Sequence, residues 1–297
     1  SPPRRMTVAA PRPGGREVEL FNDSSFSELR ARDQVPDDFI DEGWSLANLQ
    51  AGGGKGGTLM ARAGAYIVKE LSPGDHATLL QVTGSYFAHV TGGDTLLCPF
   101  YLHFRDVETG RCFFAMRDAV GKGPFIALYD LKGCADDKLI ERDGVPIKAV
   151  HKRIWNVNMW VNKRSWTAER RQYFQGKVEA RGVDVQLTAD QRDRCLKSIE
   201  RDTQWLSQNQ LMDYSLLVAI RRAPKGVAAA CGGGDGAAQG HRPMLHNTAD
   251  GGVVSVNVSI IDFLQKWTTG KRVAMALKAL ERNKATVPPS VYGRRFS

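Results

Sequence analysis

Two aspartates in this chain stand where apolar, strand-like runs begin or end. Asp213 lies in the run LMDYSLL at residues 211–217, and Asp262 follows the alternating run VVSVNVSII at residues 253–261. Burying a carboxylate among apolar side chains is costly unless a cation accompanies it. Each aspartate is therefore a candidate for binding a metal ion or aligning a reacting hydroxyl group. The alternative is structural, because either carboxylate could cap a helix or a turn.

A glycine-rich stretch and a lysine could together bind phosphate. Residues 52–57, which include Gly54, Gly56 and Gly57, precede a strand-like run that ends in Lys69. Glycines let backbone N–H groups approach phosphate oxygens, and a lysine on the next strand can neutralise their charge. A flexible turn is the alternative explanation of the glycine cluster.

The tetrapeptide DLKG at residues 130–133 places Asp130 and Lys132 at the end of another apolar run. Taken alone, this pair could be a surface ion pair at a turn. For an isolated DLKG this structural interpretation is favoured.

The chain order of these residues matches what phosphoryl transfer requires. The nucleotide phosphates must be held, a metal ion must bridge them, and a carboxylate must align the attacking hydroxyl. Lys69, Asp262 and Asp213 stand in positions to fill these three roles in turn.

The elements that must position these residues change in type along the chain. A hairpin around residues 65–69, a helix over 76–90 and two apolar runs at 96–104 and 112–116 predict a small antiparallel sheet with one helix. The later part predicts a helix over 189–209 and a strand over 253–261.

Two segments have compositions that disfavour a packed core. Residues 1–36 are rich in proline, glycine and arginine and are predicted to form a disordered tail. Residues 223–252 are rich in glycine and alanine and are predicted to form a flexible insertion without chemistry of its own.

Composition narrows the class of protein. The 297 residues are 42% hydrophobic, which is enough for a real core, and the net charge of +9 suits an anionic partner such as nucleotide phosphates, nucleic acid or a membrane surface. The basic residues do not form a known nucleic-acid reading motif, so we expect no nucleic-acid partner.

Five cysteines without a CxxC pair indicate a reducing compartment and argue against structural zinc. No apolar run reaches the length of a membrane span, so membrane contact is expected to be peripheral.

The motifs resemble those of the phosphatidylinositol phosphate kinase family. They are YDLKG at 129–133, LMDYSLL at 211–217, IIDFLQKW at 260–267 and a closing P-x-x-Y-x-x-R-F at 289–296, so the resemblance covers residues 44–296. The H-R-D and D-F-G triplets of protein kinases are absent. The resemblance implies an α+β, two-lobed lipid-kinase fold within residues 37–297. Its N-lobe would be an antiparallel sheet with a helix at about 37–122, and its C-lobe a mixed sheet with helices at about 123–297.

The resemblance also implies roles for individual residues, with ATP and Mg²⁺ as cofactors. Asp213 corresponds to the catalytic aspartate, Lys69 to the lysine that contacts ATP phosphates, and Asp262 to the Mg²⁺ ligand. Asp130 and Lys132 fall in the family's DLKG motif, whose lysine lies in the active-site cleft, and both are expected to bind substrate.

Substrate recognition is implied for a second group of positions. Lys138 stands where the family often has an arginine near the substrate phosphate, so the charge is kept but the bidentate fork is lost. Lys271, Arg272 and Ala274 fall in the segment that docks on the membrane and reads the ring position of the phosphate. Ala274 favours a 5-phosphate 4-kinase over a 4-phosphate 5-kinase, and both remain open.

The chain also departs from the family pattern. The glycine-rich stretch lacks the family's serine pair, and no glutamate follows between residues 71 and 90 to pair with Lys69. The expected function is therefore an active phosphatidylinositol phosphate kinase, and the alternative is a pseudokinase adaptor that binds phosphoinositide membranes. Either would be cytoplasmic and peripheral at the cytosolic face of membranes, an oligomer is possible, and a first residue other than Met suggests a piece of a longer protein.

Overall fold

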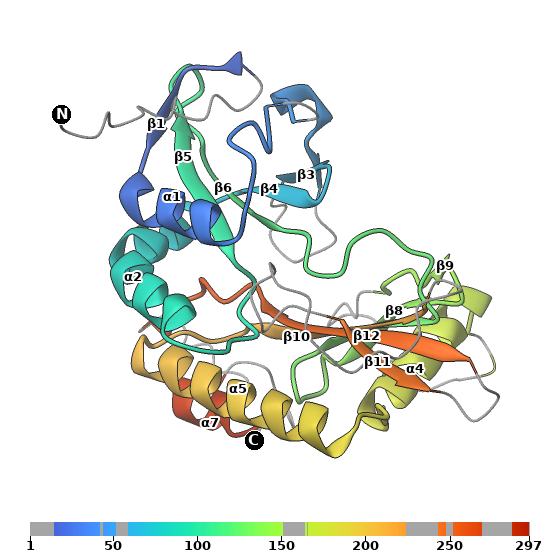
Figure 1. Ribbon diagram of the computed structural model, residues 1–297. Helices are drawn as coiled ribbons and strands as arrows, with labels where there is room; N and C mark the ends of the chain where they lie inside the picture. Colours follow the sequence, from blue (N-terminus) through green and yellow to red (C-terminus); the bar gives the residue numbers. More distant parts are fainter. Residues whose placement is uncertain are drawn as a thin grey trace. The chain divides into compact units, whose positions relative to one another are not determined.

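The computed structural model describes residues 15–41, 44–51, 59–150, 164, 166–223, 243–247, 252–268 and 287–296. These residues divide into two compact units. The first contains the described residues up to 94 and residues 98–121, and the second contains residues 95–97 and the described residues from 122 onward. Each unit combines one six-stranded sheet with helices, which confirms the α+β, two-lobed fold (Figure 1).

The sheet of the first unit is antiparallel throughout. In spatial order its strands are β1 (Val18–Leu20), β5 (Phe100–Asp106), β6 (Cys112–Arg117), β4 (Tyr66–Glu70), β3 (Leu59–Ala63) and β2 (Gln50–Ala51). A short 3₁₀ helix, η2 (Leu46–Asn48), precedes β2. Aromatic side chains fill the core of the first unit. There the Trp44 ring meets the rings of Phe104 and Phe113 edge to face, with ring centroids 5.5 Å apart in both pairs.

Two α-helices pack in the described part of this unit, where one helix was predicted. Helix α2 (Pro73–Thr91) matches the predicted helix, and it begins where the Ser72 hydroxyl accepts a hydrogen bond from the Asp75 N–H. Helix α1 (Asp23–Arg32) and β1 lie inside the predicted tail, so that prediction was wrong for residues 18–32. Phe26 and Leu29 of α1 are fully buried, and their burial outweighs the unfavourable composition of the surrounding segment.

The sheet of the second unit carries the predicted aspartates. In spatial order its strands are β11 (Met244–Asn247), β12 (Val253–Ile261), β10 (Ser215–Arg222), β7 (Ala127–Leu131), β8 (Lys138–Arg142) and β9 (Val145–Pro146). All pairings between these strands are antiparallel, and the predicted mixed character is limited, within the described residues, to an isolated parallel bridge between Leu97 and Ile260.

Three helices belong to the second unit in the described part of the chain: α4 (Ala168–Arg181), α5 (Ala189–Gln208) and the short α7 (Pro289–Gly293). Helix α5 confirms the prediction for residues 189–209, and a capping box between Thr188 and Gln191 fixes its start. Strand β12 has the bounds predicted for it. Helix α4 and α5 lie on the same side of the sheet (Figure 1).

Strand β11 corrects the prediction that residues 223–252 lack structure. Met244–Asn247 pair with Val253–Val256 of β12 in an antiparallel ladder. The high glycine and alanine content of the segment outweighs this short stretch in a composition-based prediction, although the stretch gains hydrogen bonds from the edge of an existing sheet.

Among the described residues, no helix has the length and apolar character needed to cross a membrane.

Candidate functional site

Three neighbouring strands of the second unit bring the predicted site residues to one end of the sheet. Ser215, the first residue of β10, pairs with Ile261, the last residue of β12. Leu216 pairs with Leu131, the last residue of β7. Because both pairings are antiparallel, these strand ends lie at the same end of the sheet. The residues just beyond them are Asp213, Asp262 and Lys132. The strand register therefore assembles a cluster that the sequence presents only as separate motifs.

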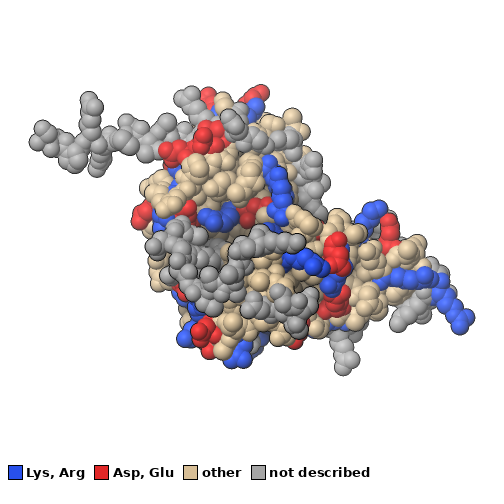
Figure 2. Space-filling model, turned by 45° about the vertical axis from the view of Figure 1, so that its right-hand side comes forward, with Lys and Arg blue, Asp and Glu red and all other residues tan. Residues whose placement is uncertain are grey.

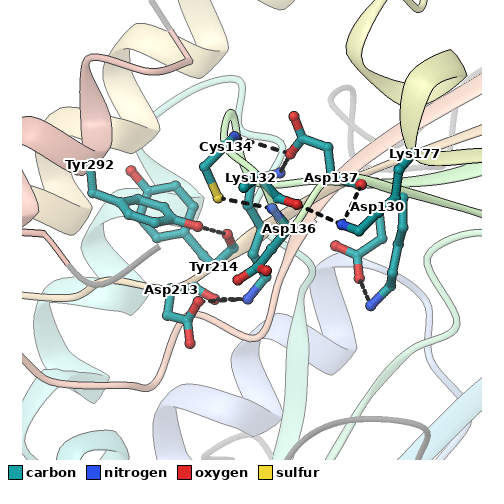
Figure 3. A network of polar contacts seen from close by, with 11 residues as sticks. Asp130, Lys132, Cys134, Asp136, Asp137, Lys177, Asp213, Tyr214 and Tyr292 are labelled. Atoms are coloured by element: carbon teal, nitrogen blue, oxygen red, sulfur yellow. Dashed lines mark hydrogen bonds and ion pairs between the residues drawn. The ribbon is translucent and has the colours of Figure 1, made fainter. Parts of the chain in front are cut away.

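Lys132 and Asp213 form an ion pair at this edge. The Lys132 Nζ donates to Asp213 Oδ1 at 2.6 Å and to the Asp213 backbone oxygen at 3.0 Å. Figure 3 shows the two side chains turned toward each other. The lysine side chain is 18% exposed and the aspartate side chain 33% exposed, so the carboxylate remains accessible from solvent.

Three carboxylates keep Lys132 charged. Burial lowers the pKa of Lys132, but Asp213, Asp130 and Asp262 raise it, and the net effect lies above the ordinary lysine value of 10.5. The ammonium group is thus the shared counter-ion of the predicted site aspartates. A lysine held in this state can also approach an anionic substrate.

Both Asp213 and Asp262 adopt a left-handed backbone conformation. Their φ angles are 61° and 59°, values that residues other than glycine seldom adopt. Such a conformation costs on the order of 1 kcal/mol or more and persists only where the surrounding structure enforces it. Strained residues of this kind concentrate at functional sites, and here two of them lie at the same end of the β10–β12 pair.

Asp130 and Lys138 form a second ion pair beside the first. They face each other across β7 and β8, with Lys138 Nζ 2.8 Å from Asp130 Oδ2. Asp130 Oδ1 is buried and has no hydrogen-bond partner within the described residues. A buried carboxylate oxygen without a donor is unfavourable, so this atom is a place where a bound group could gain a hydrogen bond.

The loop after β7 is held by two residues that the sequence did not single out. Asp137 Oδ1 accepts hydrogen bonds from the backbone N–H groups of Lys132 at 2.5 Å and Cys134 at 3.2 Å. Lys177 of α4 donates its Nζ to the backbone oxygens of Ala135 at 2.5 Å and Asp137 at 3.2 Å (Figure 3). These contacts fix the backbone that carries Lys132.

The other predicted residues are not among the described residues of the second unit. Lys69 is in the first unit, on β4, where its register partners are Met60 and Phe114. Its neighbour Glu70 accepts a hydrogen bond from Arg111 Nε at 2.7 Å. The remaining predicted positions fall outside the described residues, and they are Gly54, Gly56, Gly57, Lys271, Arg272 and Ala274.

The cluster fits a magnesium-bound nucleotide. Within the described residues there is no group of three or more His, Cys, Asp or Glu side chains that could hold a metal by itself. Mg²⁺ in phosphoryl-transfer sites is bound by one or two carboxylates together with substrate phosphates. Asp262 and Asp213, at one edge of the sheet, can supply such carboxylates, and Lys132 can approach a phosphate oxygen.

The described surface in Figure 2 shows lysine and arginine side chains interspersed with acidic ones. On this face the net charge of +9 is therefore not gathered into one continuous patch of the described residues. The cations that distinguish the site are the two paired lysines, Lys132 and Lys138.

Comparison with known proteins bears on the identity of the chain. No curated protein sequence matches it. The model of the family described as Phosphatidylinositol-4-phosphate 5-Kinase matches residues 46–231 and 230–297. This match includes every residue of the site, namely Asp130, Lys132, Lys138, Asp213 and Asp262.

Proposed function

Since the chain belongs to the phosphatidylinositol-4-phosphate 5-kinase family, we propose that it is an active lipid kinase. It transfers the γ-phosphate of ATP to an inositol-ring hydroxyl of a phosphatidylinositol monophosphate and yields the bisphosphate. The observation that carries this proposal is the Lys132–Asp213 ion pair beside Asp262 at one end of the sheet. An accessible carboxylate with a neighbouring cation suits the alignment of a hydroxyl next to a phosphate.

Asp213 is the group that orients the attacking hydroxyl. Its carboxylate accepts the hydroxyl hydrogen bond and receives the proton as the oxygen attacks phosphorus. Lys132 donates to Asp213 Oδ1, which holds the carboxylate in place before the reaction.

ATP with Mg²⁺ supplies the phosphoryl group and the cationic charge that stabilises its transfer. Asp262 would hold the metal, and Lys69 and the glycine cluster with Gly54, Gly56 and Gly57 would hold the phosphates. The backbone N–H groups of glycines suit phosphate oxygens even though the family's serine pair is missing.

Lipid recognition is assigned to the cations around the site. Lys132 and Lys138 would approach the existing phosphate of the inositol ring, and Lys271 and Arg272 would face the anionic leaflet. Ala274 would favour the 5-phosphate lipid, which leaves 4-phosphate 5-kinase activity as the other arm of the test. The corresponding location is the cytosolic face of a membrane.

One observation favours the alternative, a pseudokinase that binds phosphoinositide membranes as an adaptor. The acidic residue of α2, Asp75, lies in the first turn and accepts a hydrogen bond from the Ser72 hydroxyl at 2.8 Å. It serves the helix start, and α2 contains no second acidic residue, whereas the family usually has a glutamate in this helix. This departure from the family pattern is what favours the adaptor.

The test is incubation of the chain with labelled ATP, Mg²⁺ and vesicles that each contain one phosphatidylinositol monophosphate. We expect labelled bisphosphate with at least one lipid, and the preferred lipid decides the ring position. Vesicle binding without any product would reject the kinase and support the adaptor. Substituting Ala274→Glu in the same assay tests ring-position preference, and an unchanged preference would remove that argument.

A further inference from the structure

We infer that the described C-terminal segment, residues 287–296, positions the Lys132–Asp213 ion pair, and that Tyr292 is its main positioning residue. This inference rests on the proposed function, because it assigns a catalytic consequence to contacts within that site. The segment contacts the residue that follows Asp213 and the residue that follows Lys132. It therefore reaches both members of the pair through their chain neighbours.

Tyr292 is hydrogen-bonded to the backbone next to Asp213. Its hydroxyl donates to the Tyr214 backbone oxygen at 2.6 Å, and the Tyr292 side chain is fully buried (Figure 3). Burial raises the pKa of Tyr292 well above the ordinary tyrosine value, and the charge of Asp213 raises it further. The phenol therefore remains protonated and acts as a donor throughout the working pH range.

Aromatic packing fixes the direction of this hydrogen bond. The Tyr214 and Tyr292 rings meet edge to face at 4.6 Å, and Phe296 lies 5.3 Å from the Tyr214 ring. Gly293 lies against α5, where an added Cβ would stand 3.5 Å from Thr203 Cβ. The segment is thus anchored on α5 and Tyr214 together.

Gly133 provides the second contact. It follows Lys132, has a φ of +64°, and an added Cβ would lie 2.7 Å from Arg295 Cβ and 3.1 Å from the Arg295 backbone oxygen. Only glycine allows this close approach. The backbone of the lysine loop and the backbone of the C-terminal segment therefore touch directly.

The strained backbone at Asp213 explains why such contacts matter. A left-handed aspartate is maintained only when its neighbours are held. On the N-terminal side, the Met212 N–H donates to the Gln265 backbone oxygen at 2.9 Å. On the C-terminal side, Tyr292 binds the Tyr214 oxygen. Loss of the Tyr292 hydroxyl would release one of the two sides.

The test compares Tyr292→Phe with Tyr129→Phe. Tyr129 donates a hydrogen bond of the same length, 2.6 Å, to Glu179 Oε1 in the same unit, away from the C-terminal segment. Two readouts are taken: hydrogen exchange of peptides covering residues 132–137 and 211–217, with β8 as the internal reference, and the rate of lipid phosphorylation.

Tyr292→Phe should speed exchange in both peptides relative to β8 and lower kcat about fivefold with little change in KM for ATP, whereas Tyr129→Phe should do neither. Exchange like that of the unsubstituted chain, or the same acceleration in Tyr129→Phe, would overturn the inference, as would an unchanged kcat in an active enzyme. If the unsubstituted chain phosphorylates no lipid, the proposed function fails, and the exchange result still decides whether the segment positions the pair.

A second pair of variants guards against unfolding of Tyr292→Phe. Gly133→Ala introduces a Cβ against Arg295, and Gly144→Ala introduces one at another left-handed glycine, φ +78°, in the turn between β8 and β9. Both carry similar backbone strain, but only Gly133→Ala should speed exchange in the 211–217 peptide. Equal exchange of this peptide in the two variants would contradict the proposed contact.

Discussion

Asp106 in the first unit and Asp213 in the second are both carboxylates at strand ends, yet their surroundings differ. The Asp106 side chain is 0% exposed. It accepts hydrogen bonds from Arg16 Nε and Nη2, from the Thr109 backbone N–H at 2.8 Å and from the Thr109 hydroxyl at 2.7 Å. Asp213 is 33% exposed, is paired with Lys132 and has a left-handed backbone.

We propose that the difference separates a structural carboxylate, Asp106, from a functional one, Asp213. The pKa of Asp106 is lowered to about 2, mainly by the hydrogen bond from Arg16 and further by those from Thr109. The carboxylate therefore stays ionised and closes the turn between β5 and β6. Asp213 remains accessible to solvent and has a strained backbone conformation. Such strain destabilises a folded protein and is found mainly at functional sites.

The largest effects are expected at the two site aspartates, Asp213 and Asp262. Asp262→Asn keeps a side chain that tolerates the left-handed conformation but removes the charge that would hold the metal. We expect kcat to fall about a thousandfold, with a melting temperature within about 2 °C of the unsubstituted chain. Initial rates and calorimetry measure the two quantities. Near-normal turnover would show that Asp262, like Asp106, is structural.

Lys132→Met should reduce kcat about a hundredfold, because Asp213 loses its counter-ion and the substrate phosphate loses a cation. The control is Lys148→Met, which removes a largely exposed lysine paired with Glu169 at 3.0 Å and should change the rate less than about twofold. Steady-state kinetics distinguish the two. Equal losses would mean that general charge, and not the site, supports activity.

Asp106→Asn should have the opposite profile. Weakening a buried carboxylate with several donors should lower the free energy of unfolding by about 2 kcal/mol, while turnover per folded molecule changes less than about twofold. Glu108→Gln, at an exposed partner of the same Arg16, should cost less than about 0.5 kcal/mol. Urea unfolding measures both. A large loss of turnover in folded Asp106→Asn would break the comparison.

The same contrast appears in the pH dependence of stability. The pKa of Asp106 is about 2 in the folded chain against an ordinary 3.8, so its contribution is complete above 3.8 and disappears as the pH falls toward 2. The stability difference between the unsubstituted chain and Asp106→Asn should shrink over that interval in unfolding experiments. A constant difference would show that Asp106 does not act through its charge.

The smallest effect is expected at Tyr214. Its hydroxyl is buried and has no hydrogen-bond partner within the described residues, whereas the Tyr292 hydroxyl has one. Tyr214→Phe should leave the unfolding free energy unchanged or raise it by a few tenths of a kcal/mol, and Tyr292→Phe should lower it by about 1 kcal/mol. Thermal unfolding of the two variants tests this order, which a larger loss in Tyr214→Phe would reverse.

Local sequence patterns predicted much of the fold and the candidate site. Asp213, Asp262 and Lys132 were identified because each adjoins an apolar run, and the antiparallel register then brings them together. Helix α5 and strand β12 were predicted because their apolar periodicity is uninterrupted. In these regions local propensity and tertiary packing agree.

The rest depends on contacts between residues far apart in the chain. Lys177 holds the loop after β7 from 40 or more residues away, and no local pattern distinguishes it from the other basic residues of α4. Helix α1 and strand β11 were missed because segment-wide composition concealed a few apolar residues that packing stabilises. The turn before Asp137 can be predicted from the sequence. The hydrogen bond that Asp137 accepts from the Lys132 N–H is seen only in the structure.

The most direct measurement is the rate of phosphatidylinositol monophosphate phosphorylation by Asp213→Asn and Asp106→Asn, each normalised to folded protein. Asparagine preserves the shape of both side chains and tolerates the left-handed backbone at Asp213. The account predicts a loss of at least about a thousandfold for Asp213→Asn and less than about twofold for Asp106→Asn. Product formation by Asp213→Asn at the rate of Asp106→Asn would contradict the assignment of Asp213 as the catalytic carboxylate.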